Sequence, residues 1–189
     1  MMDRVLFINA CVRPCSRTKE LAQAVLDNLG GGMEEVNLCR MPIKTLDLDG
    51  MERREEAAQK QDFSHSDFDL AKQFAAADKI VIAAPYWDMM VPAVLKTYLE
   101  NITVSGITFR YSEQGIPESL CKAKALYYVT TAGGFIGQND FGFSYVKALS
   151  QTFFGITQVH RYAAEGLDIW GADVEKIMCK AKMEITSDR

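Results

Sequence analysis

Short apolar runs alternate with segments of helical periodicity along this chain. The runs end at polar or turn residues, as strands buried in a parallel sheet do. Five segments are predicted to be strands: residues 5–8, 36–38, 79–84, 125–130 and 156–163. Five segments with inward-facing apolar positions are predicted to be helices: residues 16–29, 67–77, 92–102, 143–154 and 172–183. Strands and helices therefore follow one another in regular order.

Two segments stand outside this alternation. Residues 42–66 are charged and poor in large apolar side chains, which predicts a surface excursion with a short helix near residues 52–60. Residues 105–115 carry turn residues around an aromatic stretch and predict a hairpin or an extended loop. Glycines 30–32 follow the first predicted helix and are expected to end it, because glycine accepts the left-handed cap conformation.

The alternation predicts an α/β fold with helices on both faces of a parallel sheet, because crossovers between parallel strands are right-handed. Five strands in a chain of this length favour a flavodoxin-like three-layer sandwich, with a five-stranded parallel sheet in the order 2-1-3-4-5. The whole chain, residues 1–189, is then a single domain. Ligands of such folds bind at the carboxyl ends of the strands, so the loops after the first, third and fourth strands are the candidates.

Composition narrows the class of protein. A formal net charge of -4 over 189 residues argues against a protein built to bind nucleic acid or anionic membranes, which needs a clustered basic surface. The five cysteines are scattered and have no metal-ligand spacing, which indicates reduced thiols and no metal site. The chain has no signal-peptide pattern and no apolar run long enough for a membrane span. A cytoplasmic location is therefore expected.

The three candidate loops offer different chemistry. Residues 9–18 end at a helix start, where free N–H groups, hydroxyls and arginines suit a phosphate; simple capping of the helix is the alternative. Residues 85–92 carry adjacent aromatic rings, which suit a flat ring system or pack on the next helix. Residues 130–135 contain adjacent glycines, whose backbone can approach a planar ligand or form a plain turn. FMN, a flat cofactor with a phosphate tail, meets all three requirements.

Several motifs in and between these loops occur together in one known family. They are Ser16-Arg17-Thr18, Pro85-Tyr86-Trp87-Asp88-Met89, Pro92-x-x-Leu95-Lys96-x-Tyr98, Gly106-x-Thr108-Phe109-x-Tyr111 with Gly115, and Thr130-Thr131-Ala132-Gly133-Gly134. In this order the chain resembles the flavodoxin-like NAD(P)H-dependent FMN oxidoreductases, in particular the FMN-dependent NADH-azoreductases and, more distantly, the mammalian quinone reductases. The resemblance covers most of the chain.

The resemblance implies FMN as the cofactor and NADH or NADPH as the electron donor. It implies a cofactor site drawn from all three loops: Asn9, Ser16, Arg17, Thr18, Pro85, Tyr86, Trp87, Asp88, Met89, Thr131, Ala132, Gly133, Gly134 and Phe135. The first loop would bind the ribityl phosphate, the second the isoalloxazine, and the third its pyrimidine side. The family works as homodimers with the flavin at the subunit interface, so a homodimer that takes a small-molecule acceptor is expected.

The implied activity is hydride transfer from NAD(P)H to quinone, azo or nitro acceptors by a ping-pong mechanism. The flavin carries this chemistry, and no side chain is expected to act as a catalytic group. Two alternatives remain: a flavodoxin-like electron carrier, and a non-catalytic flavin-binding or redox-sensing module.

Large apolar groups crowd the site region and either meet a partner subunit or fill the chain's own core: Trp87, Met89, Met90, Phe135, Phe141 and Phe143.

Some positions depart from the family pattern. Asn9 stands where many members have serine, and Ala132 stands where a close branch has arginine. Asp88 stands where asparagine is usual, and its carboxylate is expected to oppose negative charge on a reduced flavin. Residues 135–136 replace a stretch where some relatives have histidine. The identity of the acceptor therefore does not follow from the resemblance.

Overall fold

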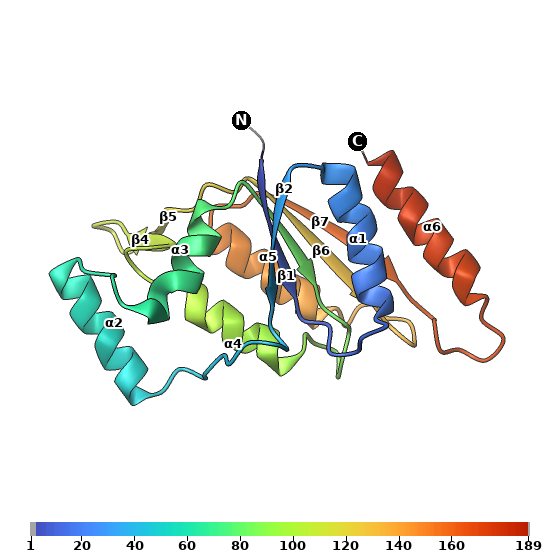
Figure 1. Cartoon of the computed structure of the whole chain (residues 1–189), viewed down its shortest axis with the longest axis horizontal. Coiled ribbons are helices and arrows are strands. Elements are labelled where there is room, and N and C mark those ends of the chain that lie inside the picture. Colours follow the sequence, from blue (N-terminus) through green and yellow to red (C-terminus); the bar gives the residue numbers. More distant parts are fainter. Residues whose placement is uncertain (1–2, 189) are drawn as a thin grey trace.

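The five predicted strands form one parallel sheet at the centre of the molecule (Figure 1). The computed structural model describes residues 3–188. The strands of the sheet are β1 (Arg4–Asn9), β2 (Gly32–Asn37), β3 (Lys79–Ala83), β6 (Ala125–Thr131) and β7 (Gln158–Ala164). Their order in space is β2-β1-β3-β6-β7, which is the predicted order 2-1-3-4-5 when only the strands of this sheet are counted. The flavodoxin-like fold class is therefore confirmed.

Helices cover both faces of this sheet (Figure 1). One face carries α1 (Arg17–Leu29) and α6 (Val174–Ser187), and the other carries α3 (Asp69–Ala76), α4 (Ala93–Ile102) and α5 (Phe141–Thr152). The three layers of the predicted sandwich are thus present. Over residues 3–188, no helix has the length and apolar character needed to cross a membrane.

Side chains that alternate along each strand build two separate cores. Leu6 and Ile8 of β1 point toward the layer of α3, α4 and α5, where Phe74 is fully buried. Val5 and Phe7 point to the opposite core, against α1 and α6. Because both faces of β1 are covered by helices, neither set of alternating side chains faces solvent, and both sets are apolar. That is why the central strands are continuous apolar runs in the sequence.

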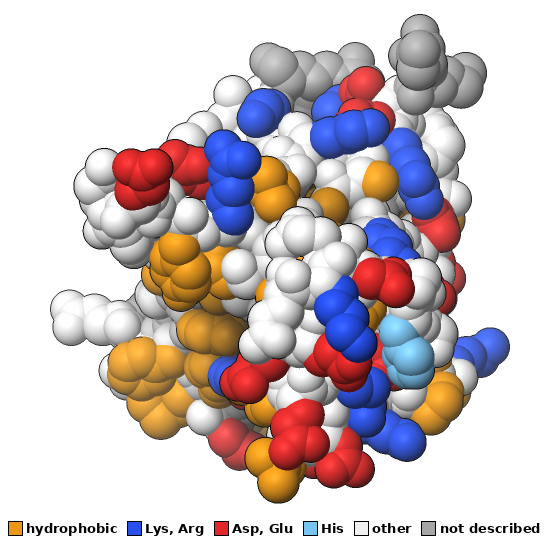
Figure 2. Space-filling view, turned by 90° about the vertical axis from the view of Figure 1, so that its left-hand side faces the viewer, with side chains coloured by type: hydrophobic (Ala, Val, Ile, Leu, Met, Phe, Trp, Pro, Cys, Tyr) orange, Lys and Arg blue, Asp and Glu red, His pale blue; other side chains and the backbone are white. Residues whose placement is uncertain are grey.

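Two insertions lie beside the layer of α3, α4 and α5. The excursion after β2 contains α2 (Leu48–Lys60), which begins before the predicted residue 52. The segment predicted as a hairpin or an extended loop over residues 105–115 is a hairpin that extends further, with strands β4 (Phe109–Tyr111) and β5 (Pro117–Ser119). Figure 2 views this side of the molecule and shows hydrophobic side chains gathered on part of it, next to charged ones. Exposed apolar side chains occur on α2 and in or next to the hairpin: Leu48, Met51, Tyr111, Ile116 and Leu120.

The edge strand β2 differs most from its predicted bounds. It begins at Gly32, well before the predicted residue 36, and ends at Asn37. Its first residue pairs with Arg4 of β1, and this pairing, not an apolar run, defines the strand. Gly30 has φ 60° and ends α1 as predicted, whereas Gly32 already belongs to the sheet.

Three helices also have different bounds. The predicted helix at residues 67–77 divides into a 3-10 turn (Ser66–Phe68) and α3. Helix α5 begins at Phe141, before the predicted residue 143, because the Asp140 side chain accepts a hydrogen bond from the backbone N–H of Phe143 and caps the helix. The last helix extends to Ser187. These shifts leave the loops at the carboxyl ends of β1, β3 and β6 where the sequence places them.

Candidate functional site

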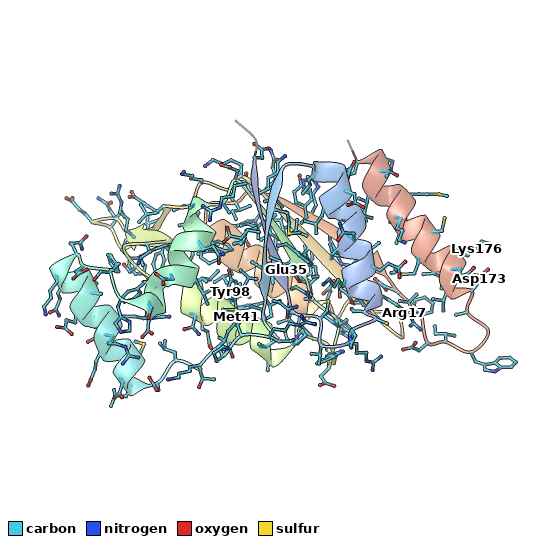
Figure 3. All side chains as sticks on the ribbon, in the orientation of Figure 1. Arg17, Glu35, Met41, Tyr98, Asp173 and Lys176 are labelled. Carbon is cyan, nitrogen blue, oxygen red and sulfur yellow. The ribbon has the colours of Figure 1, made fainter. Side chains whose placement is uncertain are left out.

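A cleft of about 360 Å³ opens at the carboxyl ends of β1, β3 and β6. Its walls come from the three predicted loops and from a fourth loop, between β7 and α6. The lining residues are Val12, Arg13, Ser16, Arg17, Thr18, Pro85, Tyr86, Trp87, Thr131, Ala132, Gly133, Leu167 and Asp168. Figure 3 shows Arg17 at the end of α1 that faces this edge of the sheet. The structure therefore brings together most of the predicted cofactor residues.

Five predicted cofactor residues do not line the cleft. Asn9 is buried at the root of the first loop. Asp88 and Met89 form the exposed tip of the turn that follows the second loop's aromatic residues. Gly134 and Phe135 follow the residues of the third loop that line the cleft, and both are exposed to solvent, Phe135 by 78%. These residues border the cleft or support it from behind.

The first loop presents the start of α1 to the cleft. Ser16 caps the helix, since its hydroxyl accepts a hydrogen bond from the N–H of Lys19 at 3.3 Å. The first N–H groups of a helix have no partners within it, so those of Arg17 and Thr18 remain for another acceptor. The hydroxyls of Thr18 and Thr131 lie 2.6 Å apart and join the first loop to the third. The capping interpretation of this loop is therefore correct, and it coexists with an anion-binding geometry.

Asn9 holds the root of this loop. Its Nδ2 donates to Glu35 Oε1 at 2.7 Å, and its Oδ1 accepts from the N–H of Cys11 at 2.9 Å. The hydrogen bond from Asn9 is the main reason why the pKa of Glu35 is lowered. Burial raises the pKa of the Cys11 thiol, whereas Cys15 is exposed to solvent. Asn9 thus supports the loop with both ends of its amide.

The second loop closes in a tight hairpin turn. The N–H groups of Trp87 and Met90 donate to each other's carbonyl oxygens, at 3.0 and 2.8 Å. Asp88 and Met89 between them have φ 49° and 67°, the left-handed region that both centre positions of a type I′ turn require. The Tyr86 hydroxyl donates to the carbonyl of Asn139 at 2.9 Å, which ties this loop to the approach of α5. The turn thereby fixes the aromatic pair at the mouth of the cleft.

The third loop runs alongside the fourth loop and is bonded to it through the backbone. The N–H of Leu167 donates to the carbonyl of Ala132 at 3.2 Å, and that of Asp168 donates to Gly133 at 2.9 Å. The N–H of Gly166 donates to the carbonyl of Gly134, also at 2.9 Å. Within residues 3–188, the N–H groups of the two loop glycines have no protein acceptor. The third loop therefore directs its carbonyl groups to the fourth loop, and its two glycine N–H groups stay available for a ligand.

The adjacent glycines of the third loop predict either the close approach of a planar ligand or a plain turn, and the structure places a side chain of the fourth loop against Gly133. A Cβ at this position would lie 2.5 Å from Oδ2 of Asp168. The Asp168 side chain of the fourth loop, which is 70% exposed, therefore lies directly against the backbone of this glycine. Asp168 and Leu167 of that loop were missed, because nothing in the sequence marks residues after the last strand as neighbours of the third loop.

Arg161 of β7 braces the far end of the third loop. Its Nε donates to Asp140 Oδ2 at 2.7 Å, and its Nη2 donates to Glu165 Oε1 at 2.9 Å. Asp140 caps α5 through the N–H of Phe143, and Glu165 Oε2 accepts from the N–H of Ile136 at 2.9 Å. One guanidinium therefore connects the last strand, the start of α5 and the loop that lines the cleft.

The apolar residues near the cleft divide into two groups. Met90 and Phe143 are partly buried and pack against the chain's own core, which is one of the two alternatives that the sequence leaves open. Trp87, Met89, Phe135 and Phe141 remain exposed, by 41%, 44%, 78% and 53%. The four residues of the second group are therefore accessible to another molecule.

A parallel sheet in this order, with a cleft built from these loops, defines a flavodoxin-like protein. The chain belongs to the protein family described as having a flavodoxin-like fold, whose model matches residues 3–187. It is 31% identical over 189 residues to the FMN-dependent NADH:quinone oxidoreductase of Clostridium beijerinckii, covering 95% of this chain and 94% of that protein. It is 34% identical over 193 residues to FMN-dependent NADH:quinone oxidoreductase 2 of Clostridium acetobutylicum, with 94% and 93% coverage.

A solved structure agrees with this assignment. The crystal structure of azoreductase from Bacillus anthracis str. Sterne matches with a TM-score of 0.83 and 25% sequence identity. The match covers 98% of both chains. The likeness therefore extends over the whole architecture.

Proposed function

We propose that this protein is an FMN-dependent oxidoreductase that passes reducing equivalents from NAD(P)H to quinone and azo acceptors. The observation that carries the proposal is the cleft itself, where loops after three strands present a helix start, aromatic rings and backbone N–H groups to one space. The named relatives are FMN-dependent NADH:quinone oxidoreductases and match nearly the full length of the chain.

The first loop is suited to hold the phosphate of FMN. The open N–H groups of Arg17 and Thr18 stand at the positive end of the α1 dipole. Arg13 and Arg17 line the same part of the cleft and add positive charge. Ser16 and Thr18 contribute hydroxyls. This set matches the chemistry of a phosphate dianion, which needs several donors and cationic partners.

The second and third loops are suited to the ring. Tyr86 and Trp87 offer flat apolar surface, and the unpaired N–H groups of Gly133 and Gly134 offer donors for ring oxygens and for negative charge near the pyrimidine. When bound, FMN supplies hydride acceptance and donation, and the residues of this chain bind and orient it. We therefore assign no side chain a role as nucleophile or acid–base catalyst.

The substrate side of the proposal follows from the shape of the site. A single mouth, bordered by Tyr86 and Trp87, serves both the nicotinamide donor and the acceptor, so the two exclude each other. This predicts ping-pong kinetics with parallel double-reciprocal plots at several quinone concentrations. Converging lines in the absence of product would contradict a shared site. Nitro compounds are further acceptors to test, and we expect the enzyme to work in the cytoplasm.

We also propose that the active form is a homodimer with the cleft at the interface. A groove of about 560 Å³ runs between α2, α4 and α5 and is lined in part by Leu46, Leu48, Met51, Leu99, Tyr145 and Leu149. Together with the exposed apolar residues at the cleft, it offers surface that a second subunit would cover.

The test is a flavin titration followed by reduction. We expect the purified protein to bind FMN with a change in flavin fluorescence, and NADH to bleach the bound flavin in the absence of oxygen. Arg17→Gln should weaken FMN binding, whereas Arg110→Gln, on the hairpin outside the cleft, should not. Bound flavin that NADH fails to bleach would indicate an electron carrier instead, and absence of flavin binding would indicate a non-catalytic module.

A further inference from the structure

An acidic side chain stands in the wall of a cleft whose proposed ligand carries a phosphate. Asp168 comes from the fourth loop, between β7 and α6, and lines the cleft together with Arg13 and Arg17. A carboxylate and a phosphate repel each other, so phosphate sites ordinarily exclude acidic residues. The position of Asp168 in this cleft therefore needs a physical explanation.

The fold sets the position of this carboxylate. The N–H of Asp168 donates to the carbonyl of Gly133, and the preceding residue, Leu167, donates to Ala132. The carboxyl group lies against Gly133 so closely that a Cβ there would be 2.5 Å from Oδ2 and 3.1 Å from Cγ. The backbone hydrogen bonds fix the position of residue 168, and its carboxyl group lies over Gly133 at the wall of the cleft.

The partner of Asp168 is the arginine at the start of α1. Arg17 Nη1 lies 2.8 Å from Asp168 Oδ1, and this ion pair bridges the first and fourth loops. The two side chains are 42% and 70% exposed. Ion pairs with this much exposure contribute little to stability, so the guanidinium can change partners at low cost.

We propose that Asp168 competes with the phosphate of FMN for Arg17, so that the guanidinium exchanges the carboxylate for the phosphate when the cofactor binds. The proposal rests on the proposed FMN function. Asp168 keeps Arg17 at the cleft before binding and lowers the affinity of the site for anions. A small anion such as inorganic phosphate meets the same competition and lacks the ring contacts that offset it, so Asp168 keeps such anions from occupying the site.

The experiment compares FMN with riboflavin, which has the same ring and no phosphate. Dissociation constants are measured by flavin fluorescence for wild type, Asp168→Asn, Arg17→Gln and the double variant. Asp168→Asn should tighten FMN binding about fivefold and change riboflavin binding less than about twofold. In the Arg17→Gln background, the same substitution should alter FMN binding less than about twofold. Inorganic phosphate itself should also bind Asp168→Asn more tightly than wild type, which is measured by its displacement of FMN added well below the dissociation constant of the cofactor.

Asp173→Asn provides the matched control. It removes one negative charge close to the same loop, at the start of α6, where Asp173 Oδ1 accepts from the N–H of Lys176 (Figure 3). Asparagine caps a helix as well as aspartate does, so the fold should be unaffected. FMN and riboflavin affinities should both remain at their wild-type values in this variant.

The outcomes separate this inference from the proposed function. Unchanged or weaker FMN binding by Asp168→Asn, with wild type binding FMN, overturns the inference alone. Equal tightening for FMN and riboflavin, or an undiminished effect in the Arg17→Gln background, overturns it as well, because the effect would then not act through the phosphate and Arg17. If wild type and all variants fail to bind FMN, the proposed function falls and the inference falls with it.

Discussion

The turn between Trp87 and Met90 shows how backbone conformation sets requirements on single residues. Both centre positions lie in the left-handed region, which aspartate and asparagine tolerate and most other side chains avoid. Asp88 therefore fits its position for a conformational reason that is independent of any charge effect on a flavin. Met89 has no such compensation, and 44% of it is exposed, so little burial offsets its strain.

We expect Met89→Gly to stabilise the protein. Relief of left-handed strain, worth about 1–2 kcal/mol, exceeds the added flexibility of glycine in the unfolded chain, so the free energy of unfolding should rise by about 0.5–1 kcal/mol. Met51→Gly is the control, since Met51 is 43% exposed but lies inside α2. There the same substitution should cost about 1 kcal/mol. Urea unfolding of both variants decides it: a loss of stability in Met89→Gly would show that the turn is not strained.

At the scale of elements, two polar braces position the loops of the cleft. Arg161 joins β7 to the start of α5 and to the end of the third loop. Asn9 joins the end of β1 to Glu35 of β2 and to the first loop. Both braces stand behind the cleft, where they fix loop geometry and leave the lining to other residues.

Loss of the Arg161 brace should destabilise the fold. Arg161→Gln leaves the Asp140 carboxylate, whose side chain is 14% exposed, without its cationic partner, so a cost of about 2 kcal/mol is expected. The control is Arg110→Gln, because the Arg110–Glu118 pair is 65% and 47% exposed and should contribute less than about 0.5 kcal/mol. Chemical unfolding measures both. Equal losses of stability in the two variants would contradict a larger contribution from the partly buried hydrogen bonds of Arg161.

The Asn9–Glu35 bond predicts a dependence of stability on pH. The pKa of Glu35 is lowered in the folded protein, first by the hydrogen bond from Asn9, so the unfolded state binds a proton more readily. The stabilisation is therefore present above the unfolded pKa, near 4.5, and is lost as the pH falls through the lower folded value. Glu35→Gln should flatten the fall in stability between neutral and acidic pH. Glu52→Gln, on the exposed surface of α2, should leave the wild-type slope; identical slopes in all three proteins would contradict the role of Glu35.

The sequence predicts the elements whose apolar pattern is local, and misses those defined by a partner. Residues 79–84 read as a strand because both faces are buried, and the structure has β3 there. The start of β2 carries Met33 and Glu34, and only its register against β1 makes it a strand. Most of the candidate site followed from the loops after β1, β3 and β6. Asp168 did not, since its place on Gly133 arises from tertiary hydrogen bonds that leave no periodicity in the sequence.

At the scale of the whole molecule, apolar surface remains that this chain does not bury. It occurs at the mouth of the cleft, in the loop between β7 and α6, on α2 and around the hairpin. The last two lie on the side seen in Figure 2. The opposite side is closed by α1 and α6, whose inner faces pack on the sheet. The proposed homodimer would have its second subunit on the side of α2, α4 and α5, where the apolar groove lies.

Light scattering at micromolar concentration should give about twice the chain mass of 21.1 kDa. Leu48→Lys, at a position of α2 that is 72% exposed and lines the groove, should shift the protein toward monomer, because the interface would have to bury a charge. Met183→Lys on α6 is 62% exposed and should leave the mass unchanged. A wild-type mass near that of one chain would rule out the dimer.

The hydrogen bonds between the third and fourth loops continue the pairing of β6 and β7 beyond the ends of the strands. Ordering a residue's backbone costs about 1–2 kcal/mol, and for this segment the ordering occurs during folding, before any ligand arrives. The exposed residues 12–15 have no such ladder, so the entropy lost on binding should be concentrated there. Amide exchange with deuterated water should therefore be slow at Leu167 and Asp168 in the free protein, and a ligand should slow it chiefly in the first loop.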